Sequence, residues 1–148
     1  MLKPLFIIFF IFSININCYS QEEYFLTLRN DEVNLRQGPS KKYPVKLVYK
    51  KKFLPVLVYD MSDNFRKIRD HENNTGWIHI SQLSKKKAAI VIDESLILFS
   101  ASTLYSNPIA ILKKGRLVKI SKCRNDWCKI KTDNFKGWVK KESLWGLL

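Results

Sequence analysis

The sequence predicts an all-β protein made of two copies of one small barrel or sandwich, and two observations support this fold class. Apolar and polar residues alternate with a period of two over short stretches, and turn residues separate these stretches at close intervals. One pattern also occurs twice. The letters FRKI at 65–68 and GWI at 76–78 return as WCKI at 127–130 and GWV at 137–139. A chain that repeats a pattern in this way is expected to repeat a fold.

The first 20 residues have the layout of a signal peptide. Lys3 precedes an unbroken apolar run at 5–12, and polar residues follow before Ser20. The run is shorter than the roughly 20 apolar residues that span a bilayer. We therefore expect cleavage before Gln21, export, and no membrane insertion after cleavage. Lipidation of Cys18 and an uncleaved N-terminal anchor are the alternatives that the sequence leaves open.

The first unit is expected to span residues 21–84. Alternation of apolar and polar side chains predicts strands at 56–59 and 65–69. Turn-forming residues follow each strand, at 60–64 and at 71–74. Strands of this length and spacing are typical of small sandwiches and barrels.

Three lysines at 85–87 form the predicted linker, and the second unit is expected to span 88–148. Its strands are expected at 117–122 and 128–131, on either side of a turn at 124–126. A unit of about 60 residues is near the lower limit for burying its own core. Because the linker is so short, we expect the two units to touch and to stabilise each other.

Cys123 and Cys128 are predicted to form a disulfide. Two cysteines in the mature part of an exported chain indicate such a bond. With Asn125 and Asp126 as a two-residue hairpin loop, the cysteines face each other about 4.5–5.5 Å apart at Cα. That separation lies within the roughly 4.4–6.8 Å that a disulfide spans. A bond across so small a loop would mainly fix the register of the hairpin.

No catalytic residue, metal ligand or cofactor is predicted. A Cys–His hydrolase is the enzymatic alternative, but a disulfide would consume its nucleophile, and His71 and His79 both belong to the first unit. A zinc site from the same four residues has a tolerable cysteine spacing and no other support. The sequence also lacks a recognisable Ser-His-Asp arrangement, a glycine-rich phosphate loop and a carboxylate dyad.

The chain is strongly basic, with 26 basic and 13 acidic residues and a formal net charge of +13. Both units share the excess, which attracts anions such as acidic glycans, teichoic or phospholipid head groups, and nucleic acid. The abundance of lysine, isoleucine and asparagine is equally consistent with an A+T-rich coding sequence. Because the chain is expected to be exported, we predict no nucleic-acid partner.

The opening of the first unit, letters VNLRQGPS at 33–40, resembles the N-(L/V)-R-x-G-P-S motif of bacterial SH3-like (SH3b) domains. The repeated FRKI…GWI pattern is similar to the W-x-K-V…G-W-V ending of that family. The second unit keeps the ending, but its opening at 97–102 has lost the motif. The resemblance to exported tandem SH3b proteins implies two five-stranded, partly open barrels. It also implies a binding role without catalysis, directed at cell-wall peptides or at partner enzymes held at the wall.

Five residues of the first unit are the candidate ligand-binding residues. Arg36 either fixes the loop before Gly38 or pairs with a ligand carboxylate, for which a guanidinium is well shaped. Trp77 either closes the barrel end or offers a platform for an apolar or sugar face. Tyr43, Tyr59 and Phe65 are expected to be exposed aromatics beside the groove.

We therefore expect a non-enzymatic module in the periplasm or cell envelope that binds peptidoglycan or a peptide. The first unit is the expected binder because it keeps the opening motif, and the second is expected mainly to stabilise it. The alternative is a protein adaptor that tethers an envelope enzyme or complex.

Overall fold

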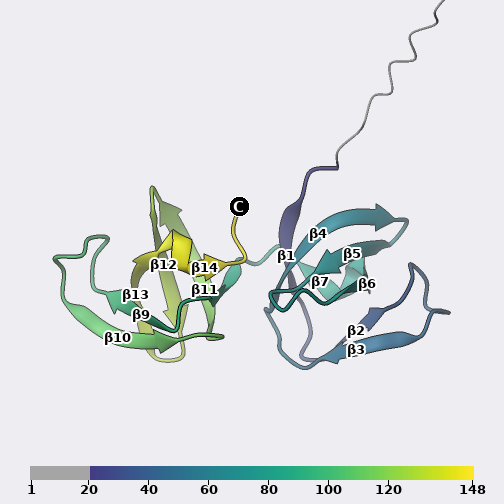
Figure 1. The fold of residues 1–148 in the computed structure, drawn as a ribbon, viewed down its shortest axis with the longest axis horizontal. Coiled ribbons are helices and arrows are strands. Elements are labelled where there is room, and N and C mark those ends of the chain that lie inside the picture. The colour runs from purple at the N-terminus through teal and green to yellow at the C-terminus, as the bar shows by residue number, and fades with distance from the viewer. Residues whose placement is uncertain (1–20) are drawn as a thin grey trace, which may run out of the picture.

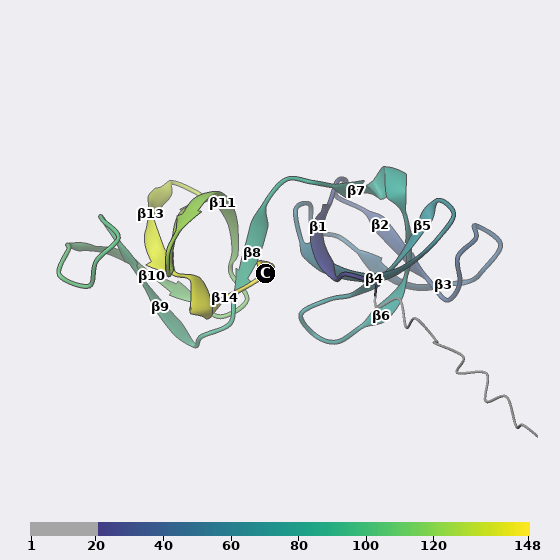
Figure 2. The same cartoon turned by 90° about the horizontal axis from the view of Figure 1, so that it is seen from above.

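The computed structural model describes residues 21–148, so the predicted signal peptide and Cys18 lie outside the described residues. The described chain forms two antiparallel β-sheets, one in each half, each curled into a small barrel. Figures 1 and 2 show the two barrels side by side, joined by one short segment. The predicted all-β fold with two tandem units is confirmed.

The first sheet has seven strands in the order β3-β2-β6-β5-β4-β1-β7. A 3-10 turn at Ile80–Gln82 separates the last two strands along the chain. The strands are β1 (Tyr24–Leu28), β2 (Val33–Arg36), β3 (Val45–Tyr49), β4 (Pro55–Ser62), β5 (Phe65–Arg69), β6 (Thr75–His79) and β7 (Leu83–Ser84).

The second sheet repeats this arrangement in the order β10-β9-β13-β12-β11-β8-β14. A 3-10 turn at Lys141–Ser143 occupies the matching place before the last strand. The strands are β8 (Ala88–Val91), β9 (Ser95–Phe99), β10 (Pro108–Lys113), β11 (Leu117–Arg124), β12 (Trp127–Thr132), β13 (Phe135–Lys140) and β14 (Leu144–Trp145). The duplication that the repeated pattern predicts therefore extends to the whole topology.

Each unit contains seven strands, where the resemblance implied five. Two strands in each unit show no clear alternation that the sequence could reveal. The edge strands β3 and β10 expose most of their residues, so neither presents a regular buried face. The strands β7 and β14 contain two residues each, too few to show a period. Residues 85–87 lie between β7 and β8, outside any strand.

The repeated Gly-Trp pair closes each barrel. A Cβ atom on Gly76 would lie 2.7 Å from the backbone oxygen of Arg36, on the neighbouring strand β2. A Cβ atom on Gly137 would lie 2.5 Å from the backbone oxygen of Phe99, on β9. Real Cβ atoms do not approach a backbone oxygen this closely, so only glycine lets these strands meet. The glycine of the repeat is thus required by barrel closure in both units.

The two units share part of one hydrophobic core. Ile90 on β8 of the second unit belongs to the buried cluster of the first, and Leu117 packs against the same cluster. The ring of Phe25 lies 4.9 Å from the ring of Trp145 in an edge-to-face arrangement, which joins β1 to β14. These contacts agree with the expectation that the short linker brings the units together, and they bury apolar surface that each small unit would otherwise expose.

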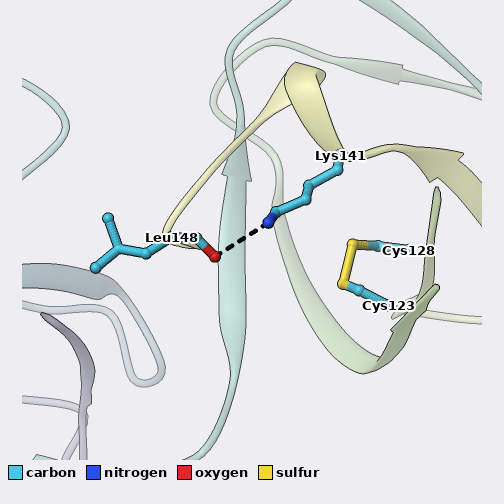
Figure 3. Close-up of a disulfide and its surroundings, with 4 residues drawn as sticks. All are labelled: Cys123, Cys128, Lys141 and Leu148. Carbon is cyan, nitrogen blue, oxygen red and sulfur yellow. Dashed lines mark hydrogen bonds between the residues drawn. A yellow bond between two sulfur atoms is a disulfide. The ribbon is translucent and has the colours of Figure 1, made fainter. Parts of the chain in front are cut away.

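The predicted disulfide between Cys123 and Cys128 is confirmed (Figure 3). The two residues face each other on β11 and β12 as predicted, with their Cα atoms 4.0 Å apart, closer than the predicted separation. Cys128 is fully buried in the second core, whereas Cys123 is exposed. The bond therefore ties the exposed end of β11 to the core of the second unit.

A buried carboxylate organises the turn between β5 and β6. Asp70 is 2% exposed, and its Oδ2 atom accepts a hydrogen bond from the Tyr49 hydroxyl at 2.9 Å. The carboxylate also accepts hydrogen bonds from the backbone N–H groups of Glu72 and Asn74 and from the side-chain amide of Asn74. In each of these contacts the carboxylate is the acceptor. Asp70 therefore holds the turn between β5 and β6 in place and connects this turn to Tyr49 on β3.

The stability of the first unit is expected to fall above about pH 10 because of Tyr49. Burial, and next the hydrogen bond to Asp70, raise the pKa of the Tyr49 hydroxyl above its ordinary value. A raised pKa favours the neutral form in the folded state, so this contribution is present below pH 10 and is lost as the pH rises further. Urea denaturation from pH 8 to pH 11.5 should show a steeper loss for the wild-type chain than for Tyr49→Phe. Parallel pH profiles of the two chains would contradict this prediction.

Candidate functional site

A row of basic and aromatic side chains crosses the outer face of the first sheet. The strand register places Arg36 opposite Trp77, and Trp77 opposite Lys67. The Nζ atom of Lys67 lies 5.8 Å from the centre of the Trp77 ring and 5.5 Å from that of Tyr59. We name these four residues, from β2, β6, β5 and β4, the basic-aromatic row. Three of the five predicted site residues therefore come together.

The period of the strands explains why these side chains point outward. Leu35, Ile68 and Ile78 are fully buried in the core. Their neighbours Arg36, Lys67 and Trp77 must point to the opposite face, because successive side chains of a strand alternate. Tyr59 follows the buried Val58 at a register shift between β4 and β5. Such a bulge changes the direction of a strand locally, and here it lies beside Tyr59 at one end of the row.

The opening motif places Tyr43 next to the row. The Nη1 atom of Arg36 donates to the backbone oxygen of Tyr43 at 2.9 Å. A Cβ atom on Gly38 would lie 2.6 Å from three ring atoms of Tyr43, so the ring lies flat against the glycine backbone. Tyr43 remains 48% exposed. Arg36 thus fixes the loop, as one of its two predicted roles requires, while the rest of its guanidinium has no hydrogen bond within the described residues.

Phe65 is not the exposed aromatic that the sequence suggested. It is 7% exposed, and its ring lies 5.1 Å from the ring of His79 in an edge-to-face contact. The register pairs these two residues across β5 and β6, so the histidine packs against the phenylalanine. Phe65 is two positions before Lys67 on β5, so it lies on the same face of the sheet as the row.

The second unit carries a different version of the same row. Phe99 occupies the place of Arg36, opposite Trp138, and Trp138 lies opposite Lys129. The Nζ atoms of Lys122 and Lys129 each lie 5.8 Å from the centre of the Trp138 ring. The second row is therefore aromatic and basic but contains no guanidinium.

Sequence reasoning missed the lysines of both rows. Lys67 and Lys129 occupy the same position of the repeated pattern, and this shared lysine is the signal that could have identified them. Only the register shows that each one lies against a tryptophan. The two ion pairs within the described residues, Lys114 with Glu94 and Arg116 with Asp133, involve neither row.

Residues 21–148 contain no cluster of three or more side chains that could hold a metal ion. The disulfide engages both Cys123 and Cys128. The Nδ1 atom of His79 lies 2.7 Å from the hydroxyl of Ser81.

No helix in the described part of the chain has the length and apolar character needed to cross a membrane.

Comparison with known proteins gives one family, and the similar solved structures include two distant ones. No curated protein sequence matches the chain. The structure of NlpC2 from Trichomonas vaginalis is 13% identical, with a TM-score of 0.38, and the match covers 84% of this chain and 48% of that one. For NlpC1 from the same organism the identity is 12%, the TM-score is 0.39, and the coverage is 84% and 46%. This chain spans about half the length of either structure.

The sequence model of the bacterial SH3 domain matches two adjacent segments, residues 29–85 and 94–146. Together they make up more than half of the chain, and each falls on one of the two barrels. The topology, the repeated closing element and this double match agree, and the chain belongs to the bacterial SH3 domain family, with two domains in tandem.

Proposed function

We propose that this protein is an exported, non-enzymatic module of the cell envelope that binds peptidoglycan or a peptide through the basic-aromatic row of its first domain. The observation that carries the proposal is the alignment of Arg36, Trp77, Lys67 and Tyr59 across four adjacent strands of one sheet. Membership of the bacterial SH3 domain family supports a role at the cell wall.

The chemistry of the row favours a ligand with both a carboxylate and an apolar or sugar face. Arg36 and Lys67 are the direct neighbours of Trp77 on either side, so two cations flank one indole. A guanidinium pairs well with a carboxylate, and an indole offers a large flat apolar surface. Lys67 also contacts the rings of both Tyr59 and Trp77, which orders them before a ligand arrives.

The absence of catalysis is part of the proposal. The disulfide leaves no free thiol on the described residues, which removes the nucleophile of a Cys–His hydrolase. Export rests on the predicted signal peptide together with the disulfide, since such bonds persist in oxidising compartments.

Sedimentation with purified sacculi tests this proposal. The mature protein is expected to co-sediment, and Trp77→Ala is expected to weaken binding about tenfold or more, as the loss of a central aromatic contact does. Arg36→Lys keeps the charge but loses the planar fork, so we expect an intermediate loss. Trp138→Ala, the equivalent change in the second domain, is the matched control and should bind like wild type. Circular dichroism checks that each variant is folded.

A salt series separates specific binding from general attraction between charges. Binding that disappears at moderate salt and ignores Trp77→Ala would point to nonspecific charge. A failure to sediment even at low salt would contradict the proposal.

A protein adaptor is the second candidate, and the hairpin of β9 and β10 favours it. Ile97 faces Ile111 on this hairpin, and the two side chains are 42% and 63% exposed. Leu104 and Tyr105 in its loop are 62% and 100% exposed. The loop between β9 and β10 lies on the side away from the first domain (Figures 1 and 2). Apolar side chains exposed together are typical of protein contacts. A crosslinked pull-down that recovers one defined protein, without sacculus binding, would favour this candidate.

A further inference from the structure

The two domains enclose a cleft of about 1020 Å³ that is separate from both rows. Its walls come from β1, from the segment around β7, from residues 85–88 and from residues 146–148. Figures 1 and 2 show the C-terminal segment lying between the two barrels, where this cleft is found. Clefts that bind small molecules in proteins commonly have volumes of roughly 300–1,000 Å³.

Part of the lining of the cleft is apolar. Phe25, Leu26 and Leu83 line it from the first domain, and Leu147 lines it from the second. Phe25 also contacts Trp145, so both domains build this wall and hold it in place. Ile80, which is 40% exposed, adds an apolar side chain to the same lining.

All of the charged side chains that line the cleft are basic. Its side chains include Arg29, Arg66 and the three lysines at 85–87, and they include no aspartate or glutamate. Arg29 is held by a hydrogen bond from its Nε atom to the backbone oxygen of Leu83 at 3.0 Å. Apolar walls together with five basic side chains attract anions.

Arg66 supplies a donor that lacks an acceptor. Its Nη1 atom donates to the backbone oxygens of Asp63 and Phe65, both at 3.0 Å, and this fixes the guanidinium. Its Nε atom is buried and has no hydrogen-bond partner within the described structure. A buried donor without an acceptor is unfavourable. The Arg66 side chain lines the cleft, so a ligand carboxylate there would lie beside a guanidinium whose hydrogen bonds are incomplete.

We propose that this interdomain cleft binds an amphipathic carboxylate, with the carboxylate on Arg66 and the apolar chain against Phe25, Leu26, Leu83 and Leu147. The positive lining excludes a cationic amphiphile, and the apolar wall gives a free small anion too few contacts. The same chemistry occurs in a fatty acid and in the free C-terminus of an apolar peptide, so the test includes both.

Isothermal titration of the mature protein tests the proposal. Sodium dodecanoate, kept below its micelle concentration, is expected to bind with one-to-one stoichiometry. Dodecanol and dodecyltrimethylammonium have the same chain without the carboxylate, and we expect at least tenfold weaker binding for each. The tripeptide Ala-Phe-Leu and its C-terminal amide form the peptide arm. The carboxylate ligand that binds more tightly identifies the natural source.

Two variants localise the site. Arg66→Gln is expected to weaken carboxylate binding at least tenfold, whereas Arg116→Gln, at an exposed arginine outside the cleft, should leave it unchanged. Ile80→Asp places a negative charge at an exposed position of the lining and should weaken binding similarly, even if Arg66→Gln does not fold. Trp77→Ala should have no effect, which separates this site from the row.

Three results would overturn the proposal. The first is that neither dodecanoate nor the free tripeptide binds. The second is equal binding of the ligands that lack the carboxylate. The third is carboxylate binding that a folded Arg66→Gln or Ile80→Asp variant leaves unchanged.

Discussion

Asp70→Ala is expected to lower the free energy of unfolding by about 3 to 5 kcal/mol, because it removes several hydrogen bonds to one charged acceptor, each contributing about 1.5 to 3 kcal/mol at most. The carboxylate accepts four hydrogen bonds, one of them from the hydroxyl of the buried Tyr49. Alanine leaves these donors without their acceptor, and the Tyr49 hydroxyl is the most deeply buried of them. The turn that Asp70 holds also connects the strands of Lys67 and Trp77. Urea denaturation followed by tryptophan fluorescence measures the loss.

Thr132→Ala is the matched control for this change. Thr132, the last residue of β12, occupies the equivalent buried position in the second domain, and its hydroxyl donates to the backbone oxygen of Leu117 at 3.4 Å. One long hydrogen bond contributes about 1 kcal/mol or less. If Asp70→Ala cost no more than Thr132→Ala, the carboxylate would not organise the first domain.

Gly76→Ala is expected to lower the free energy of unfolding by about 2 to 3 kcal/mol, the usual range for overpacking in a well-packed interior. The new Cβ atom would lie 2.7 Å from the backbone oxygen of Arg36 and 2.7 Å from the Cγ atom of Leu35. A backbone oxygen has no alternative rotamer, so β2 must move away from β6. Because Arg36 and Trp77 face each other across this contact, sacculus binding should weaken as well.

Gly115→Ala separates crowding from backbone strain. Gly115 has a φ of +79°, and nothing lies within 4 Å of a Cβ atom placed there. Its cost is therefore the conformational penalty alone, about 1 kcal/mol. A change below about 0.5 kcal/mol for Gly76→Ala would show that β2 and β6 can separate freely, contrary to the proposed closure.

Much of the fold could be predicted from local patterns. The alternation at 65–69 and 128–131 correctly predicted strands, because a half-buried strand imposes a period of two on its own residues. The disulfide could also be predicted, since a two-residue loop determines which residues face each other. The edge strands β3 and β10 escaped prediction because they bury too little surface to produce a regular pattern.

The candidate site could be predicted only in part. The structure brings the candidates Arg36, Trp77 and Tyr59 together in the row, and the opening motif and the Gly-Trp pair mark the strands that carry two of them. Lys67 was missed, because its role depends on the residue that faces it from another strand. Phe65 was misjudged for the same reason, since His79 packs against it from β6.

By itself, the sequence determined the duplication, the β class and the disulfide of this protein, because each depends on residues that are close along the chain. Only the tertiary structure decided which side chains form the row, how the domains meet and where the cleft lies. Those features include contacts between residues far apart along the chain, such as Arg36 with Trp77 and Phe25 with Trp145. Their contacts depend on strand order and domain packing, which no local pattern of apolar and polar residues records.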